Sequence, residues 1–235
     1  MFELAVWSVV VVILATGAIG GGYWVSERIV GHEAARRNLR YGWPWVMLGF
    51  AIAFLTSMAF TYWGNLLGWR FFPLILPLLF VLGVVGWLLS WQFRKRSAGD
   101  LLLNAGRPPQ SRFLFWIGLF EVAMAIYMTA TALFRQSLYS EGMILNLTGV
   151  VFWWTLAAFF LALGLSRLEF RKNGICFMYA FIPWVRMTSY GWEASKSNTL
   201  TIRLQSRLPV LPSFMSISVP ERHRSAIDRI VSALV

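Results

Sequence analysis

The stretch GICFMYAFIPWVRMTSYGWE, residues 174–193, decides how the C-terminal part of this chain is built. It begins with apolar residues of the kind that cross membranes, but Pro183 interrupts it and the sequence beyond is polar. A helix needs about 20 apolar residues to cross the hydrocarbon core of a bilayer, and the apolar run 175–185 has roughly half of that. A proline inside a helix also removes a backbone hydrogen bond. We therefore predict that this stretch is not a membrane span.

The composition of the whole chain is that of an integral membrane protein. Of its 235 residues, 58% are hydrophobic and only 13% are charged, whereas about a quarter of the residues in a soluble domain are charged. The net charge of +11 would suggest nucleic-acid binding in a soluble protein. Here the basic residues lie between apolar runs, where they set the orientation of the spans. We therefore expect no nucleic-acid partner.

Five apolar stretches before residue 166 are long enough to be transmembrane helices. Tryptophan and tyrosine cluster at their ends, as is typical where a helix meets the lipid headgroups. The predicted spans cover about residues 4–25, 45–63, 71–93, 113–134 and 144–165. They make up a predicted all-α transmembrane domain over residues 1–165.

The charges of the loops predict the orientation of these spans. Segments 26–42 and 94–112 are rich in arginine, whereas 64–70 and 135–143 contain one basic residue each. Cytoplasmic loops carry an excess of Lys and Arg. We therefore expect the N-terminus outside and the segment after residue 165 in the cytoplasm.

Residues 166–235 have the pattern of a small α+β cytoplasmic domain. Residues 167–171, 199–204 and 215–219 alternate between polar and apolar, which is typical of strands. Asn173-Gly174 is a dipeptide typical of a tight hairpin turn, so we expect residues 175–180 to form the returning strand.

The rest of this domain follows from the same patterns. Pro183-Trp184 is expected to form a corner before a strand over 185–192. A short helix is expected after Pro220, because proline is well tolerated in a first helical turn. Its apolar residues form one stripe that can pack on a sheet; they are Ile227, Ile230, Val231 and Leu234.

The order of LEFRKNGI, FIPWV, YGWE, NTLTI and SISVPE resembles the pleckstrin-homology-like (PH-like) domains attached to membrane spans in bacteria. More closely, it is similar to an uncharacterised family of multi-spanning proteins associated with cyanobacteria. The resemblance implies a PH-like fold for residues 166–235 and a bacterial inner (plasma) or thylakoid membrane as the location. It implies no catalytic residue and no substrate.

Glu121 is the candidate intramembrane polar site, because it lies about 12 Å inside the fourth predicted span at 1.5 Å per residue. An acid at such a depth is costly and is often functional, for instance as a proton or cation site. The alternative is a protonated side chain that is hydrogen-bonded to Thr56, Ser57 or a backbone carbonyl. The sequence leaves both interpretations open.

Three further sets of residues are candidate contact sites. Gly17 and Gly21 have the spacing that lets helices approach closely, either within the chain or between chains. The arginines of segment 26–42 are candidate contacts for lipid headgroups on an interfacial helix; they are Arg28, Arg36, Arg37 and Arg40. The large apolar side chains of the opening stretch form a candidate docking surface; they are Phe177, Tyr179, Phe181 and Trp184.

The sequence contains little that points to catalysis. It has one cysteine, Cys176, and two histidines in polar segments, so we expect no metal site, no haem and no other cofactor. We therefore expect a non-catalytic membrane protein that acts as a scaffold, assembly or accessory factor of a larger complex, photosynthetic or respiratory, with lipids and a protein as partners. The main alternative is an ion or small-molecule transporter or channel that uses Glu121; a membrane enzyme is the third hypothesis.

Overall fold

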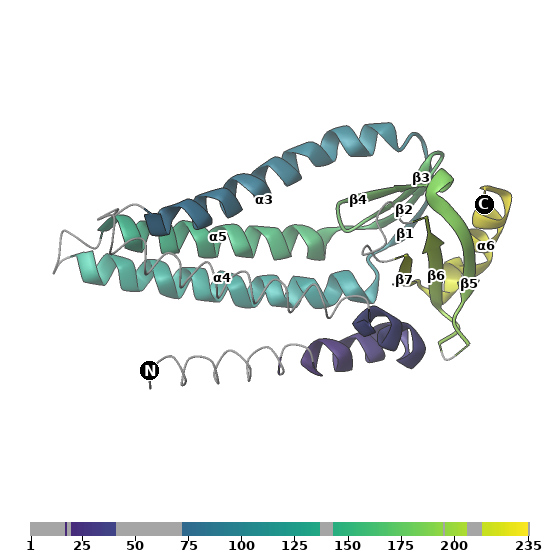
Figure 1. Ribbon diagram of the computed structural model, residues 1–235, viewed down its shortest axis with the longest axis horizontal. Helices are drawn as coiled ribbons and strands as arrows, with labels where there is room; N and C mark the ends of the chain where they lie inside the picture. Colours follow the sequence, from purple (N-terminus) through teal and green to yellow (C-terminus); the bar gives the residue numbers. More distant parts are fainter. Residues whose placement is uncertain are drawn as a thin grey trace. The chain divides into compact units, whose positions relative to one another are not determined.

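The computed structural model describes residues 17, 20–40, 72–136, 143–194, 196–205 and 213–234 (Figure 1). The chain divides into two compact units, which we describe separately. The first is Phe60–Trp184, and the second combines Met1–Ala59 with Val185–Val235.

The described residues of the first unit form three long helices, α3 (Phe72–Ser97), α4 (Pro109–Gln136) and α5 (Met143–Leu165). Each contains a segment that is long and apolar enough to cross a membrane; these are Pro77–Ser97, Pro109–Phe134 and Leu147–Leu165. They correspond to three of the five predicted spans. The predicted spans 4–25 and 45–63 lie outside the described residues, except for residues 17 and 20–25.

Ring contacts and two glycines define how these helices pack. Phe80 and Trp87 of α3 contact Phe152 and Phe159 of α5, with ring centroids 5.2 and 5.4 Å apart, so α3 and α5 run in the same direction. The helix α4 runs antiparallel to α5 and approaches it closely at Gly118 and Gly164.

A Cβ atom at either glycine would collide with the backbone of the other helix. At Gly164 it would lie 2.4 Å from Cα of Phe115, and at Gly118 it would lie 2.8 Å from N of Leu161. Close approach of helices at small residues is common in membranes. By contrast, no described atom lies within 4 Å of such a Cβ at Gly17 or Gly21, the pair that the sequence suggested.

Four antiparallel strands lie at one end of these helices, in the order β1-β2-β3-β4. They are β1 (Leu101–Gly106), β2 (Leu168–Arg171), β3 (Gly174–Phe177) and β4 (Ala180–Pro183). Strand β1 lies between α3 and α4 in the sequence. It pairs with β2, which follows α5. The sequence analysis did not predict β1. Phe170, Ile175 and Ile182 pair across three strands and form a buried row.

The predicted hairpin between β2 and β3 is confirmed, but the returning strand is shorter than expected. Residues 175–180 do not form a single strand, because the chain turns again at Met178 and Tyr179. Both residues have a positive φ, 48° and 58°, which is the geometry of a two-residue type I′ turn. The apolar stretch is therefore a hairpin, β3 and β4, rather than one strand.

The second unit contains helical residues 20–30 and 32–40 and a three-stranded antiparallel sheet in the order β5-β6-β7. The strands are β5 (Met187–Trp192), β6 (Thr199–Leu204) and β7 (Phe214–Ser218). They are followed by a short 3-10 turn, η2 (Glu221–His223), and the helix α6 (Arg224–Leu234). Ile227 and Val231 of the predicted apolar stripe are fully buried, whereas Leu234 is 42% exposed.

Candidate functional site

A cluster of three charged residues joins the end of α3 to the four-stranded sheet. Nζ of Lys95 lies 2.9 Å from Oε1 of Glu169, and Arg171 donates from Nε and Nη2 to Oε2 at 2.8 and 2.6 Å. Nη1 of Arg171 donates to the carbonyl oxygen of Gly99 at 2.8 Å. We call Lys95, Glu169 and Arg171 the Glu169 cluster.

The charges of this cluster indicate a structural role, in which an ionised glutamate is paired with two basic side chains. Burial raises the pKa of Glu169, but the hydrogen bonds and charges of Lys95 and Arg171 outweigh burial, and the pKa lies below its ordinary value of 4.5. The carboxylate is therefore ionised at neutral pH. Glu169 and Arg171 lie two residues apart and so share one face of β2, which is the signal that could have indicated this pair from the sequence.

Cys176 is paired with Glu169 across strands β2 and β3. The residue is 1% exposed, and burial raises the pKa of its thiol to about 11. A thiol acts as a nucleophile through its thiolate. Cys176 therefore does not have the properties of a reactive cysteine.

A second cluster lies along α3, where the turn between β3 and β4 meets the helix. The ring of Tyr179 lies 5.2 Å from the ring of Trp87 and 5.1 Å from that of Trp91. Nη2 of Arg94 donates to the carbonyl oxygen of Trp87 at 2.9 Å and to Oγ of Ser90 at 2.6 Å. We call Trp87, Trp91, Arg94 and Tyr179 the interface cluster.

The four side chains of the predicted docking surface differ in how deeply they are buried. Phe177 and Trp184 are buried, with 7% and 8% of their surfaces exposed. Nε1 of Trp184 donates to the carbonyl oxygens of Arg171 and Lys172 at 3.0 and 3.1 Å. Tyr179 and Phe181 are only partly buried. Two of the four side chains therefore belong to the core, and two remain at the surface.

In the second unit, helical residues 32–40 are joined to the β5-β6-β7 sheet through Glu193. Glu193 is 7% exposed and forms an ion pair with Arg37. Oγ1 of Thr201 donates to Oε1 of Glu193 at 2.5 Å and lies 2.9 Å from Oγ of Ser216. Among the described residues, each unit thus has one buried glutamate, Glu169 or Glu193, that pairs with a basic side chain from a segment outside residues 166–235.

The four predicted headgroup arginines have different environments. Arg28, Arg36 and Arg40 are exposed, and the guanidinium of Arg28 lies 3.8 Å from the centroid of the Trp24 ring. Arg37 is partly buried in its ion pair with Glu193. Three of the four are therefore placed at the surface, where a headgroup could reach them.

Glu121 lies midway along α4, as the thirteenth residue of the segment Pro109–Phe134. Its Oε2 atom is buried and has no hydrogen-bond partner among the described residues. Thr56 and Ser57, the partners considered in the sequence analysis, lie outside the described residues.

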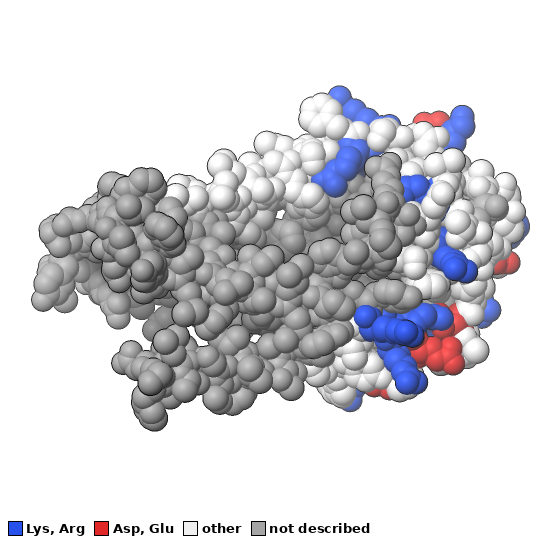
Figure 2. All heavy atoms as spheres, viewed as in Figure 1, with Lys and Arg blue, Asp and Glu red and all other residues white. Residues whose placement is uncertain are grey.

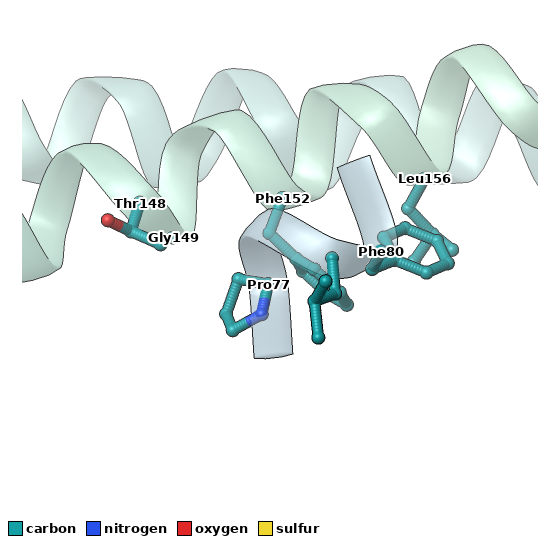
Figure 3. Close-up of a pocket in the computed structure, with 7 residues that line it drawn as sticks. Pro77, Phe80, Thr148, Gly149, Phe152 and Leu156 are labelled. Carbon is teal, nitrogen blue, oxygen red and sulfur yellow. The ribbon is translucent and has the colours of Figure 1, made fainter. Parts of the chain in front are cut away.

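A hollow of about 750 Å³ lies between α3 and α5 (Figure 3). Figure 3 shows the rings of Pro77, Phe80 and Phe152 turned into it. Thr148 provides the polar side chain of its described lining. The hollow is suited to apolar groups, and Glu121 is not part of its described lining; the residues that form it are Pro77, Leu79, Phe80, Thr148, Gly149, Phe152 and Leu156.

Basic residues lie at the C-terminal end of α3, next to the strands. The last turn of this helix contains Arg94, Lys95 and Arg96. Figure 2 shows white along the described surface of α3 and blue at the end where the strands begin. The helix therefore combines an apolar length with a basic end.

The C-terminal part of the chain matches a known protein family. Residues 166–234 match a family model described as a domain of unknown function (DUF5673). The matched DUF5673 region begins just before β2 and continues to the end of α6, so strand β1 lies outside it. The region marks an uncharacterised family. No curated protein and no solved structure matches the chain.

Proposed function

We propose that this protein is a non-catalytic integral membrane protein that acts as a scaffold, assembly or accessory factor of a larger membrane complex. Residues 166–235 would form a PH-like domain on the cytoplasmic side and present a surface to a protein partner. The resemblance noted from the sequence favours a bacterial inner (plasma) or thylakoid membrane and a photosynthetic or respiratory complex.

The observation that carries this proposal is the pairing of β1 with β2. Strand β1 lies between two membrane-length helices, and its backbone pairs with a strand of the DUF5673 region. The Glu169 cluster adds an ion pair at the same junction. A sheet that is tied to its helices in this way holds a fixed position at the membrane, as a surface for assembly requires.

The environments of the ionisable groups support a binding role over catalysis. Glu169 and Glu193 are both committed to ion pairs, and Cys176 is buried with a raised pKa. Catalytic acids and nucleophiles are usually tuned toward neutral pH and open to a cleft. These groups instead have the features of structural residues.

The charge distribution supports a cytoplasmic location for the strands. Arg94, Lys95 and Arg96 end α3, and Arg167 follows α5 at the same end. Lys and Arg are enriched on the cytoplasmic side of membrane helices. A cysteine introduced at residue 172 should be labelled by an impermeant maleimide in inside-out vesicles and not in intact cells; the opposite pattern would contradict this orientation.

The proposed function can be tested by crosslinking in native membranes, mild-detergent purification and mass spectrometry. Val185 is 87% exposed and lies in the DUF5673 region, so Val185→Asp alters its surface without removing a core contact. We expect the wild type to yield one stoichiometric partner and Val185→Asp to yield less of it. Leu89→Ala, on the exposed face of α3, is the control. A wild-type protein that purifies alone after crosslinking would overturn the scaffold proposal.

Glu121 supports a second candidate function, an ion or small-molecule transporter or channel. The supporting observation is the buried Oε2 atom without a described partner at the middle of α4. An acid at this depth is expensive unless it has a role. The protein in proteoliposomes should then conduct ions or a solute, and Glu121→Gln should abolish the flux. Absence of flux in the wild type, together with a stoichiometric partner, would reject this candidate.

A further inference from the structure

The turn between β3 and β4 has an unfavourable backbone for the residues it contains. Met178 and Tyr179 both have a positive φ, which Gly, Asn and Asp adopt more readily than bulky side chains. The hairpin thus carries two large side chains at a position where the backbone favours small ones. This combination indicates that the side chains themselves have a role at the tip.

The hairpin runs back along α3 toward the membrane. At its base, Nδ2 of Asn173 donates to the carbonyl oxygen of Ser97 at 3.0 Å, and at its tip Tyr179 contacts Trp87 and Trp91. Ten helical residues separate Trp87 from Ser97, about 15 Å along the axis. The strands β3 and β4 have four residues each, which extend about 13 Å. The two lengths agree, and Figure 1 shows the β3-β4 turn directed along the helices rather than away from them.

The tip therefore lies at the level of residues that belong to the membrane-length segment of α3. The first charged residue of α3 is Arg94, and Trp91 and Trp87 lie three and seven residues before it, about 4.5 and 10.5 Å along the axis and so in the half of α3 next to its basic end. Tryptophan and tyrosine side chains are enriched at the depth of the lipid headgroups. Trp87, Trp91 and Tyr179 form such a group of rings from two different elements.

Arg94 lies close to the same level, and its orientation is unusual. Long basic side chains near the end of a spanning helix normally extend outward to water. Arg94 instead extends back toward Ser90 and Trp87, to which it donates hydrogen bonds. No carboxylate pairs with it among the described residues. A guanidinium in this position is suited to a lipid phosphate, which it can bind through two hydrogen bonds.

We propose that the β3-β4 turn is a membrane-inserting element: Met178 and Tyr179 enter the interfacial layer beside Trp87 and Trp91, and the guanidinium of Arg94, which lies beside Trp87 and Ser90, binds a phospholipid phosphate at the same level. The ligand is a lipid of the bilayer that α3 crosses. This inference requires α3 to cross the membrane and is independent of the scaffold function. It assigns Met178 and Tyr179, at the tip of the hairpin, to lipid rather than to a protein.

The depth of the turn can be measured with a nitroxide spin label. Cys176 is the sole cysteine, so labels are introduced one at a time in a Cys176→Ala background. Met178→Cys tests the tip. Lys172→Cys is the aqueous reference in the opposite turn of the sheet, and Leu82→Cys, at a position 66% exposed on α3, is the lipid reference. The full chain is reconstituted in vesicles of phosphatidylcholine and phosphatidylglycerol.

Collision rates with oxygen and with a water-soluble nickel chelate then report depth. The label at 178 should collide more with oxygen than with the chelate, at a depth between those of the labels at 172 and 82. A label at 178 that behaves like the one at 172, or that neither reagent reaches, would overturn the insertion. Retention of the near-ultraviolet circular dichroism of the parent shows that each variant is folded.

The role of Arg94 has a separate readout. Arg94→Ala should lower the affinity for phosphatidylglycerol, measured by native mass spectrometry, by about fivefold, the contribution of one basic residue at an anionic surface. Arg94→Lys should restore part of this affinity. Arg96→Ala is the matched control, because Arg96 is exposed in the same helical turn. Equal losses for Arg94→Ala and Arg96→Ala, or no loss for Arg94→Ala, would show that Arg94 does not bind the phosphate specifically.

Discussion

Nζ of Lys95 lies 2.9 Å from Oε1 of Glu169, and this contact joins the last turn of a membrane-length helix to the second strand of a sheet. The two residues are 74 positions apart in the chain. Arg171 holds the other carboxylate oxygen, so the glutamate is bound on both sides. The contact gives the strands a fixed attachment to α3, and its removal is the first test of the fold.

We predict a graded loss of stability when either base of the Glu169 cluster is removed. The Lys95 side chain is 36% exposed, so Lys95→Met should cost about 1 kcal/mol. Arg171 is 14% exposed and makes three hydrogen bonds, so Arg171→Met should cost about 2–3 kcal/mol. The temperature at which Cys176 becomes reactive to a thiol dye reports unfolding in detergent. Arg96→Met is the control, and equal midpoints for all four proteins would contradict the prediction.

The lowered pKa of Glu169 predicts a specific dependence of stability on pH. Because the pKa is lower in the folded state than its ordinary value of 4.5, the folded protein holds fewer protons at this site than the unfolded chain. The contribution of this site is therefore fully present above about pH 4.5 and is lost as the pH falls through the lower, folded value. Glu169→Gln should remove this component. The melting temperature of the wild type should exceed that of Glu169→Gln at pH 6, and this difference should shrink as the pH is lowered to 3, because the carboxylate becomes protonated in the folded protein too. A difference that stays constant over this range would contradict the pKa shift.

Cys176 should react only when the protein unfolds. Its thiol pKa of about 11, against an ordinary value of 9.0, lowers the thiolate fraction about a hundredfold at neutral pH. Burial restricts access further, since the residue is 1% exposed. Maleimide labelling should be slow in mild detergent and rapid in dodecyl sulfate. Rapid labelling of the native protein would place Cys176 in an open site instead.

The contact between α4 and α5 should be sensitive to a single methyl group. In Gly164→Ala the new Cβ would lie 2.4 Å from Cα of Phe115, so the helices must separate or shift. We expect a loss of about 1–3 kcal/mol, the usual effect of overpacking. Gly86→Ala on α3 is the matched control, since no described atom lies within 4 Å of its Cβ. A melting temperature for Gly164→Ala equal to that of the control would contradict the close approach.

The sequence predicted the long helices well and the strands in part. Long runs of apolar residues with few charges usually form membrane-length helices, and α3, α4 and α5 are such helices. The alternation in residues 199–204 matches β6, because one face of that strand is buried. Strand β1 could not be predicted in the same way. Its residues LLLNAG form a short apolar run without alternation in a basic loop, and they become a strand because β2 offers them a partner.

The candidate site was predicted less completely than the fold. Residues 175–185 were recognised as too short to span a membrane, but the turn at Met178 and Tyr179 was missed because neither residue favours a positive φ. Of the predicted docking surface, Phe177 and Trp184 lie in the core, and a docking role for Tyr179 and Phe181 stays a prediction. An apolar side chain looks the same in a sequence whether it faces a partner, a lipid or its own sheet.

By itself, the sequence determined that this chain has membrane-length helices with a basic end and a short α+β region after them, because hydrophobic length and the position of charge act locally. Only the tertiary structure decided which loop supplies the edge strand and which glutamates are buried with a base. It also decided where the apolar hairpin lies along α3. These features depend on contacts such as Lys95–Glu169 and Tyr179–Trp87, whose partners are far apart in the chain and leave no local pattern.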